Sequence, residues 1–159
     1  MPDTDGMASA ATNEEASMGG DEPSVHDNVV LGYEVLCAER EIRLRTLYPD
    51  QEPPEQTDVR FTGVLAYHFD HALMNTSLFD IEEVSLQRVY DMFADVFLRS
   101  KNYGWPIASY SGPEDLLARL RAHGVRAFVV SSSYGMNGFV LAEAMAKVRR
   151  GSNGVQVGP

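Results

Sequence analysis

The hydrophobic pattern of residues 59–97 changes its period once, and that change constrains the fold more than any other feature of the chain. In residues 59–70, apolar side chains such as Phe61 and Tyr67 alternate with polar ones, which is typical of a half-buried strand. In residues 86–97, apolar side chains recur at spacings of three and four, the pattern of an amphipathic helix. We therefore expect a strand followed by a helix.

Local signals predict the other elements. Ser85 is a suitable N-cap for a helix over 86–100. The segment Ser111-Gly112-Pro113-Glu114 predicts a second helix through its capping-box spacing and its early proline, and His123-Gly124 ends it. Apolar runs and alternation predict further strands at 29–37, 42–48, 78–81, 107–110 and 125–132, with a polar loop at 49–56.

Residues 139–148 fit two structures. Their alanine content favours a helix, whereas the short, glycine-rich turn at 134–138 favours a hairpin with strand 125–132. We expect the hairpin. Because consecutive strands have short links, the order of elements predicts an α+β fold, with a mostly antiparallel sheet and two helices packed on one face.

The chain divides by composition into three parts. Its 159 residues are the size of one domain. Residues 1–27 carry seven carboxylates, no Lys or Arg, and few large apolar groups, so they lack the apolar surface that offsets the entropy of ordering. We expect a disordered acidic leader over 1–27, a single α+β domain over 28–150, and a flexible tail over 151–159.

The charge distribution limits the classes of partner. The formal net charge is −10, and the leader supplies −7 of it, which leaves 13 basic and 16 acidic residues in the rest. A nearly balanced domain lacks the basic face that nucleic acid binding requires. A partner attracted by charge is expected to be a basic protein.

The sequence also indicates a compartment. No run approaches the ~20 apolar residues of a membrane-spanning helix, and the N-terminus lacks the basic and apolar regions of a secretory signal. Cys37 is the only cysteine, so no intrachain disulfide can form, and we interpret it as a structural or semi-exposed thiol and not as a nucleophile. We expect a cytoplasmic protein that needs no cofactor and does not enter a membrane.

One cluster has residue types suited to a metal ion. His68 and Asp70 share a face of the predicted strand, and His71 joins them if the strand ends there. Imidazole and carboxylate groups suit zinc or iron. The spacing matches no established metal motif, so we expect exposed polar residues on a strand and keep the metal site as the alternative.

Aromatic residues near glycine and proline are the candidates for an interface. Trp105 lies between Gly104 and Pro106, and Tyr110 and Tyr134 also lie near predicted turns. Exposed aromatic side chains are common anchors of protein interfaces. The alternative for Trp105, which we favour, is that it caps the core beneath the helix. The leading hypothesis is a non-enzymatic protein-interaction domain, for example an immunity-type protein that binds a basic partner. The alternative is a small metal-dependent hydrolase that uses the histidine and aspartate cluster.

Overall fold

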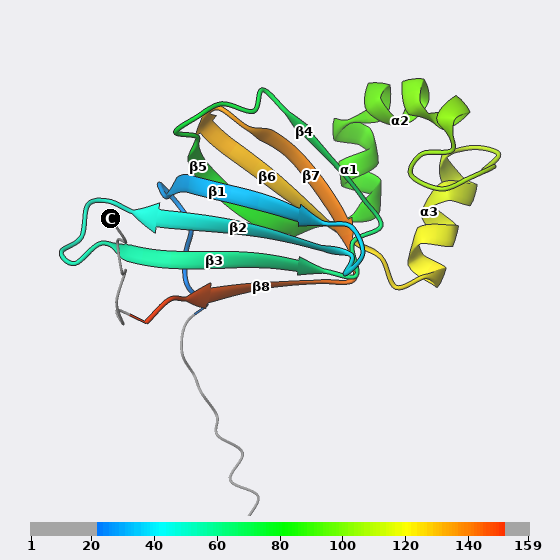
Figure 1. The fold of residues 1–159 in the computed structure, drawn as a ribbon. Helices are drawn as coiled ribbons and strands as arrows, with labels where there is room; N and C mark the ends of the chain where they lie inside the picture. The colour runs from blue at the N-terminus through cyan, green and yellow to red at the C-terminus, as the bar shows by residue number, and fades with distance from the viewer. Residues whose placement is uncertain (1–21, 152–159) are drawn as a thin grey trace, which may run out of the picture.

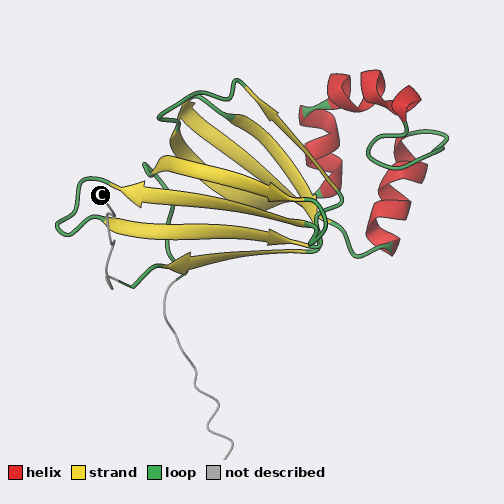
Figure 2. Cartoon of the chain, viewed as in Figure 1, coloured by secondary structure: helices red, strands yellow, loops and turns green. Residues whose placement is uncertain are grey.

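The computed structural model describes residues 22–151, which form one eight-stranded antiparallel sheet with a helical insertion between its fifth and sixth strands (Figure 1, Figure 2). The predicted α+β class and the mostly antiparallel sheet are confirmed, but the described residues contain three α-helices where two were expected. The strands are β1 (Val29–Leu36), β2 (Glu41–Tyr48), β3 (Glu55–Thr62), β4 (Ala66–Asp70), β5 (Ser77–Val84), β6 (Arg126–Tyr134), β7 (Asn137–Ala142) and β8 (Ala144–Arg149). The helices are α1 (Leu86–Met92), α2 (Ala94–Ser100), the short 3₁₀ helix η1 (Lys101–Tyr103) and α3 (Pro113–Ala122).

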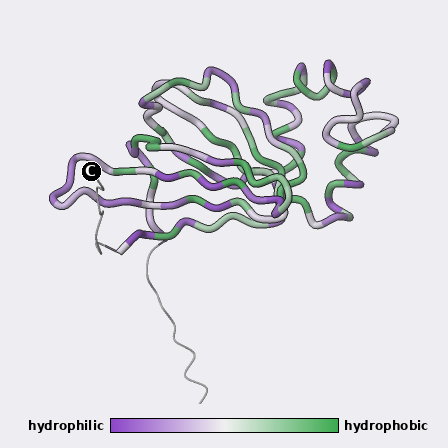
Figure 3. The backbone as a smooth tube through the Cα atoms, viewed as in Figure 1, coloured by the Kyte–Doolittle hydropathy of each residue, from purple (hydrophilic) through white to green (hydrophobic). Residues whose placement is uncertain are grey.

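The sheet folds into two halves that pack against each other. The strand order is β4-β7-β6-β5-β1-β2-β3-β8, so β1, β2, β3 and β8 form one half and the remaining strands form the other. Inward-facing side chains of both halves make one buried cluster, in which the rings of Phe61 and Phe128 lie 5.7 Å apart. Strands β6 and β7 consist largely of hydrophobic residues, in contrast to the polar loop between β2 and β3 (Figure 3). Burial of these apolar side chains is the main force that holds the halves together.

The two halves of the sheet are joined at two places, and the first, between β1 and β5, has few paired residues. Strand β1 pairs with β5 only at Val29 and Ser77. Beside that pair, the N–H of Val30 donates to the carbonyl of Thr76 over 2.9 Å. Most of β1 therefore has a strand partner on one side only, which is β2.

At the second junction, β3 continues into β4 and β7 continues into β8. The two bends lie together, because the N–H of Glu143 donates to the carbonyl oxygens of Thr62 and Gly63 over 3.1 and 3.2 Å. Gly63 has a φ of 61°, a conformation that glycine adopts without strain. The expected single strand over 59–70 is therefore wrong: β3 pairs with β2 and β8, whereas β4 pairs with β7.

A second core lies between the helices and the sheet. Strands β6 and β7 are buried on both faces: Phe128 and Val130 belong to the cluster between the halves, whereas Ala127 and Val129 belong to the cluster with the helices. The helical residues of that second cluster include Leu86, Val89, Tyr90, Phe97, Leu116, Leu117 and Leu120. Continuous apolar runs are expected in strands buried on both faces.

The helix ends agree in part with the expectations. Ser85 caps α1, since its hydroxyl accepts a hydrogen bond from the Arg88 N–H over 3.1 Å. The expected single helix over 86–100 is interrupted at Phe93, where φ is −123° and ψ is 31°. The Phe93 ring packs against Phe139 of β7 with a centroid distance of 4.7 Å.

The start of α3 differs in detail from the expectation. Its N-cap is Gly112. The N–H of Ser111 donates to the carboxylate of Asp115 over 2.9 Å, so Asp115 takes the role that was expected for Glu114. Residues 107–110 form no strand.

The expected hairpin is confirmed for β6 and β7, which pair in register from Arg126 with Ala142 to Val130 with Gly138. The expectation that residues 144–148 continue the same strand is wrong. The chain bends at Glu143 to the other half of the sheet, where β8 pairs with β3. No helix among the described residues is long and apolar enough to cross a membrane.

The folded part of the chain begins before residue 28. Val25 is fully buried in the cluster between the halves, and Asn28 is also buried. The N–H of Asp27 donates to the carbonyl of Leu78 over 3.1 Å. The expected boundary at residue 28 therefore falls within the fold, while residues 1–21 of the expected leader and 152–159 of the expected tail lie outside the described residues.

Candidate functional site

Two strands with one free side each meet at an open edge of the sheet. Among residues 22–151, strand β4 ends the strand order and pairs only with β7, and β1 has no strand partner beyond Val29 on the side away from β2. The ring of Tyr33 on β1 meets the ring of Phe69 on β4 edge-on, at a centroid distance of 5.7 Å. We call the surface between these strands the β1–β4 groove.

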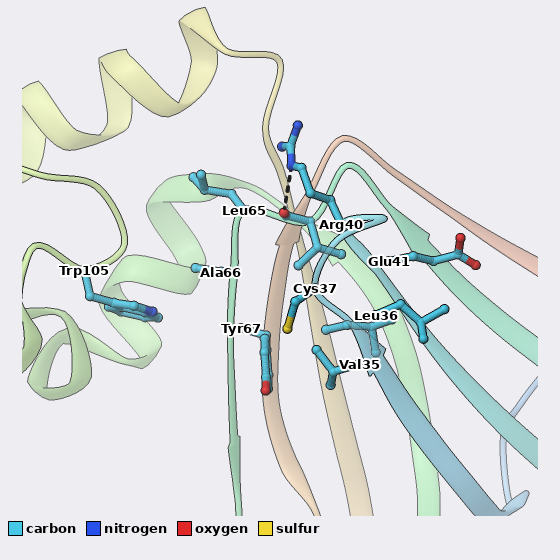
Figure 4. A pocket seen from close by; sticks show the side chains of 11 residues that line it. Val35, Leu36, Cys37, Arg40, Glu41, Leu65, Ala66, Tyr67 and Trp105 are labelled. Atoms are coloured by element: carbon cyan, nitrogen blue, oxygen red, sulfur yellow. Dashed lines mark hydrogen bonds between the residues drawn. The ribbon is translucent and has the colours of Figure 1, made fainter.

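The groove contains a pocket of about 440 Å³. Figure 4 shows Tyr67, Cys37 and Val35 close together on one side of β4, whereas Ala66 and Trp105 lie on its other side. The wall is mostly apolar. The lining residues are Val35, Leu36, Cys37, Arg40, Glu41, Ile42, Val64, Leu65, Ala66, Tyr67 and Trp105.

Arg40 holds one end of the pocket in place. Its guanidinium donates to the carbonyl oxygens of Val64 and Gly63 over 3.2 and 3.3 Å (Figure 4). In return, its own carbonyl accepts from the Val64 N–H over 2.8 Å. The tight turn between β1 and β2 is thus tied to the bend that starts β4, and the pocket lies between these two segments.

Glu41 lines the pocket but its carboxylate points away from the cavity (Figure 4). It accepts hydrogen bonds from Arg43 and Arg60, the latter over 2.8 Å. These two guanidinium groups lower the pKa of the Glu41 carboxyl from 4.5 to about 2. The carboxylate therefore stays ionised and bound at neutral pH and is not suited to exchange protons with a ligand.

We predict a pH-dependent contribution of Glu41 to stability. Because its pKa is lower in the folded state, its contribution is complete above pH 4.5 and is lost as the pH falls towards 2. Glu41→Gln should lower the unfolding free energy at pH 6, and the difference from the parent should shrink at pH 2, as urea melts would measure. Glu39→Gln, an exposed change in the same turn, is the control. An equal difference at both pH values would contradict the prediction.

The chemistry of the pocket favours binding over catalysis. Among its lining residues, the groups that commonly exchange protons or attack substrates are Cys37, Glu41 and Tyr67. Glu41 is held by its two arginines, and no histidine lines the pocket. A concave, largely apolar surface with a few polar groups is the usual form of a ligand-binding site.

The residues of the candidate metal cluster do not form a common site. The ring of His68 packs beside the contacting rings of Phe93 and Phe139, at centroid distances of 6.4 and 6.0 Å. Asp70 and His71 are exposed at the end of β4, where their side chains lie 3.8 Å apart. Within residues 22–151, no group of three or more His, Cys, Asp or Glu side chains is arranged to hold a metal ion.

The three aromatic interface candidates have different environments. Tyr110 is buried and its hydroxyl donates to the carbonyl of Phe97, so its side chain offers no surface to a partner in this structure. Tyr134 is 64% exposed at the end of β6, away from the pocket lining. Trp105 is half-buried: it packs on Phe97 with a centroid distance of 5.3 Å and also lines the pocket.

Sequence reasoning missed most of the pocket. Leu65 and Tyr67 continue the alternation of the buried Phe61, yet they are 36% and 39% exposed. The one sequence signal for this difference is Gly63, which interrupts the apolar face where the chain leaves its first partner strand. Cys37, which was expected to be a structural or semi-exposed thiol, is exposed and lines the pocket.

Comparisons of the chain with protein-family models, curated proteins and solved structures found no significant match.

Proposed function

We propose that this chain is a non-enzymatic protein-interaction domain that binds its partner in the β1–β4 groove. The observation that carries the proposal is the position of an apolar pocket between two strands that each have one free side. Exposed strand edges and exposed apolar side chains are unfavourable in a protein that has no partner for them.

The side chains of the groove support a protein ligand. Tyr33, Tyr67 and Trp105 contribute aromatic surface that is at least partly accessible. Tyrosine and tryptophan are enriched among residues that dominate binding energy, because they bury a large area with little loss of conformational freedom. The pocket has room for a few side chains and not for a folded domain, which favours insertion of a short segment of the partner.

The proposal predicts a specific loss of binding. Peptides selected from a displayed random nine-residue library against the full chain should bind Tyr67→Ala at least about tenfold more weakly than the parent, because truncation of a central interface anchor costs about 2 kcal/mol or more and about 1.4 kcal/mol corresponds to tenfold in affinity. Trp105 is the only tryptophan of the chain, so its fluorescence reports occupation of the pocket directly.

The matched control is Tyr103→Ala, since Tyr103 is 88% exposed and does not line the pocket. This variant should bind the selected peptides as the parent does, and thermal melts should show that both variants fold. If the library yields no binder, or if the binders lose affinity for Tyr103→Ala and not for Tyr67→Ala, the groove is not the interaction surface.

A further inference from the structure

We propose that the partner binds as an extended segment that adds a strand to the free edge of β4, with apolar side chains at alternating positions and basic residues at its ends. This inference rests on the proposed function and specifies the kind of partner. Strand addition is a common mode of peptide recognition, in which main-chain hydrogen bonds provide affinity and pockets for alternate side chains provide specificity.

The geometry of β4 supports this mode. The pocket is lined on one side by residues 64–67, at the start of β4, and on the other side by the end of β1 and the turn that follows. A strand added to β4 would lie about 4.8 Å from it, which places that strand over the pocket. Side chains of the guest strand that point inwards would then enter the cavity.

The two faces of β4 indicate which side chains of a guest strand would contact the pocket. Ala66 lies on the side of Trp105, whereas Tyr67 lies on the side of Cys37 and Val35 (Figure 4). A paired strand shares the alternation of its neighbour. Every second side chain of the guest would therefore lie on the side of Tyr67 and enter the cavity beside Cys37, so apolar residues at alternating positions fit this cavity.

The charges near the groove favour a basic guest. Glu39 lies in the turn at the start of the groove and Asp70 at the far end of β4, and both are exposed. Residues 28–159 as a whole are close to balance, with 13 basic and 16 acidic side chains, and the guanidinium of Arg40 in the pocket lining is bound to two main-chain carbonyl oxygens. Acidic groups near both ends of the free edge favour lysine or arginine at the ends of a guest segment, and they accelerate its association at low salt.

Strand β8 provides an internal comparison. It also ends the strand order and pairs only with β3, so its main chain has a free side as well. However, no residue of β8 lines the pocket. If main-chain pairing alone decided the site, guests would bind β8 and β4 alike, whereas the pocket predicts a preference for β4.

Backbone N-methylation of a selected peptide tests the mode of binding. In a strand, alternate N–H groups point to the same neighbour. Methyl groups at one set of alternate positions should therefore weaken binding about tenfold or more, while methyl groups at the other set change it less than about twofold. Amide exchange of the complex should show new protection in β4 and none in β8.

The outcomes separate the two proposals. If the peptide binds in the groove but N-methylation at both sets of positions has equal effects, the groove binds a partner and the strand-addition inference is wrong. If protection appears in β8, the inference is also wrong. If acidic replacements at the peptide ends leave affinity and its salt dependence unchanged, the basic character of the guest is refuted. If only a small apolar dye, 1-anilinonaphthalene-8-sulfonate, binds the pocket and no peptide does, both proposals fail.

Discussion

Phe139→Ala is expected to lower the free energy of unfolding by about 3–5 kcal/mol, the cost of truncating a fully buried phenylalanine. Phe139 is 0% exposed. Its ring stacks on Phe97 with a centroid distance of 5.4 Å and an interplanar angle of 15°, and it lies 4.7 Å from Phe93. Because Phe97 lies in α2, Phe93 lies between α1 and α2, and Phe139 lies in β7, the truncation removes contacts between the helical segment and the sheet as well as apolar burial.

Urea melts of the variant and the parent would measure this loss. Phe79→Ala is the matched control, since Phe79 is 55% exposed on β5 and an exposed site should change stability by no more than about 0.5 kcal/mol. The Trp105 ring lies 6.0 Å from Phe139, so its fluorescence should also change in the folded variant. Equal effects of the two alanine substitutions would show that the helices do not depend on this aromatic cluster.

Gly138→Ala is expected to destabilise the pairing of β4 with β7. A Cβ at residue 138 would lie 1.9 Å from the carbonyl oxygen of His68, which is a backbone atom and cannot rotate away, and φ there is 157°. Overpacking and backbone strain each cost about 1–3 kcal/mol, so we expect a loss of about 3 kcal/mol. Since β4 forms one side of the groove, peptide binding should weaken as well.

Gly32→Ala is the control for this glycine. An added Cβ at residue 32 meets no heavy atom within 4 Å, and replacing a glycine at a compatible position stabilises a protein by about 0.4–1 kcal/mol. Denaturant melts should therefore move the two variants in opposite directions, or leave Gly32→Ala unchanged. A Gly138→Ala variant as stable as the parent would show that β4 is free to shift away from β7.

Local patterns were sufficient to predict the bounds of some strands. Strands β1, β2 and β6 were expected within two residues of their observed bounds, because alternation with period 2 is a property of a few neighbouring residues. The expected hairpin of β6 and β7 is also present, since its short glycine-rich turn limits the chain to a sharp reversal.

Local patterns were insufficient where a partner distant in sequence decides the structure. The apolar alternation of 59–70 continues through Gly63, but β3 and β4 belong to different halves of the sheet. Nothing in the spacing of residues 86–100 marks a break at Phe93, whose ring contacts Phe139 of β7. Val25 is an isolated apolar residue in a polar segment, yet it is fully buried between the halves.

The candidate site also depends on contacts between residues that are distant in the sequence. The sequence placed Trp105 in a loop beside a proline, but it offered no reason to group that residue with Cys37, Arg40 and Tyr67. These residues come together because Gly63 and Glu143 bend two strands across to the other half of the sheet. The residues of the alternative metal cluster do not come together for a related reason, since the ring of His68 packs against the aromatic core whereas Asp70 and His71 are at the surface.

The sequence by itself determined the α+β class, the antiparallel character of the sheet and the position of most strands, because these follow from hydrophobic periods and turns that act over a few residues. Only the tertiary structure decided which strands are neighbours and where an edge remains free. Those properties depend on pairings between residues such as Phe61 and Met145, 84 positions apart in the chain, and no local pattern encodes a pairing at that distance. The groove between β1 and β4 exists only as a consequence of those pairings.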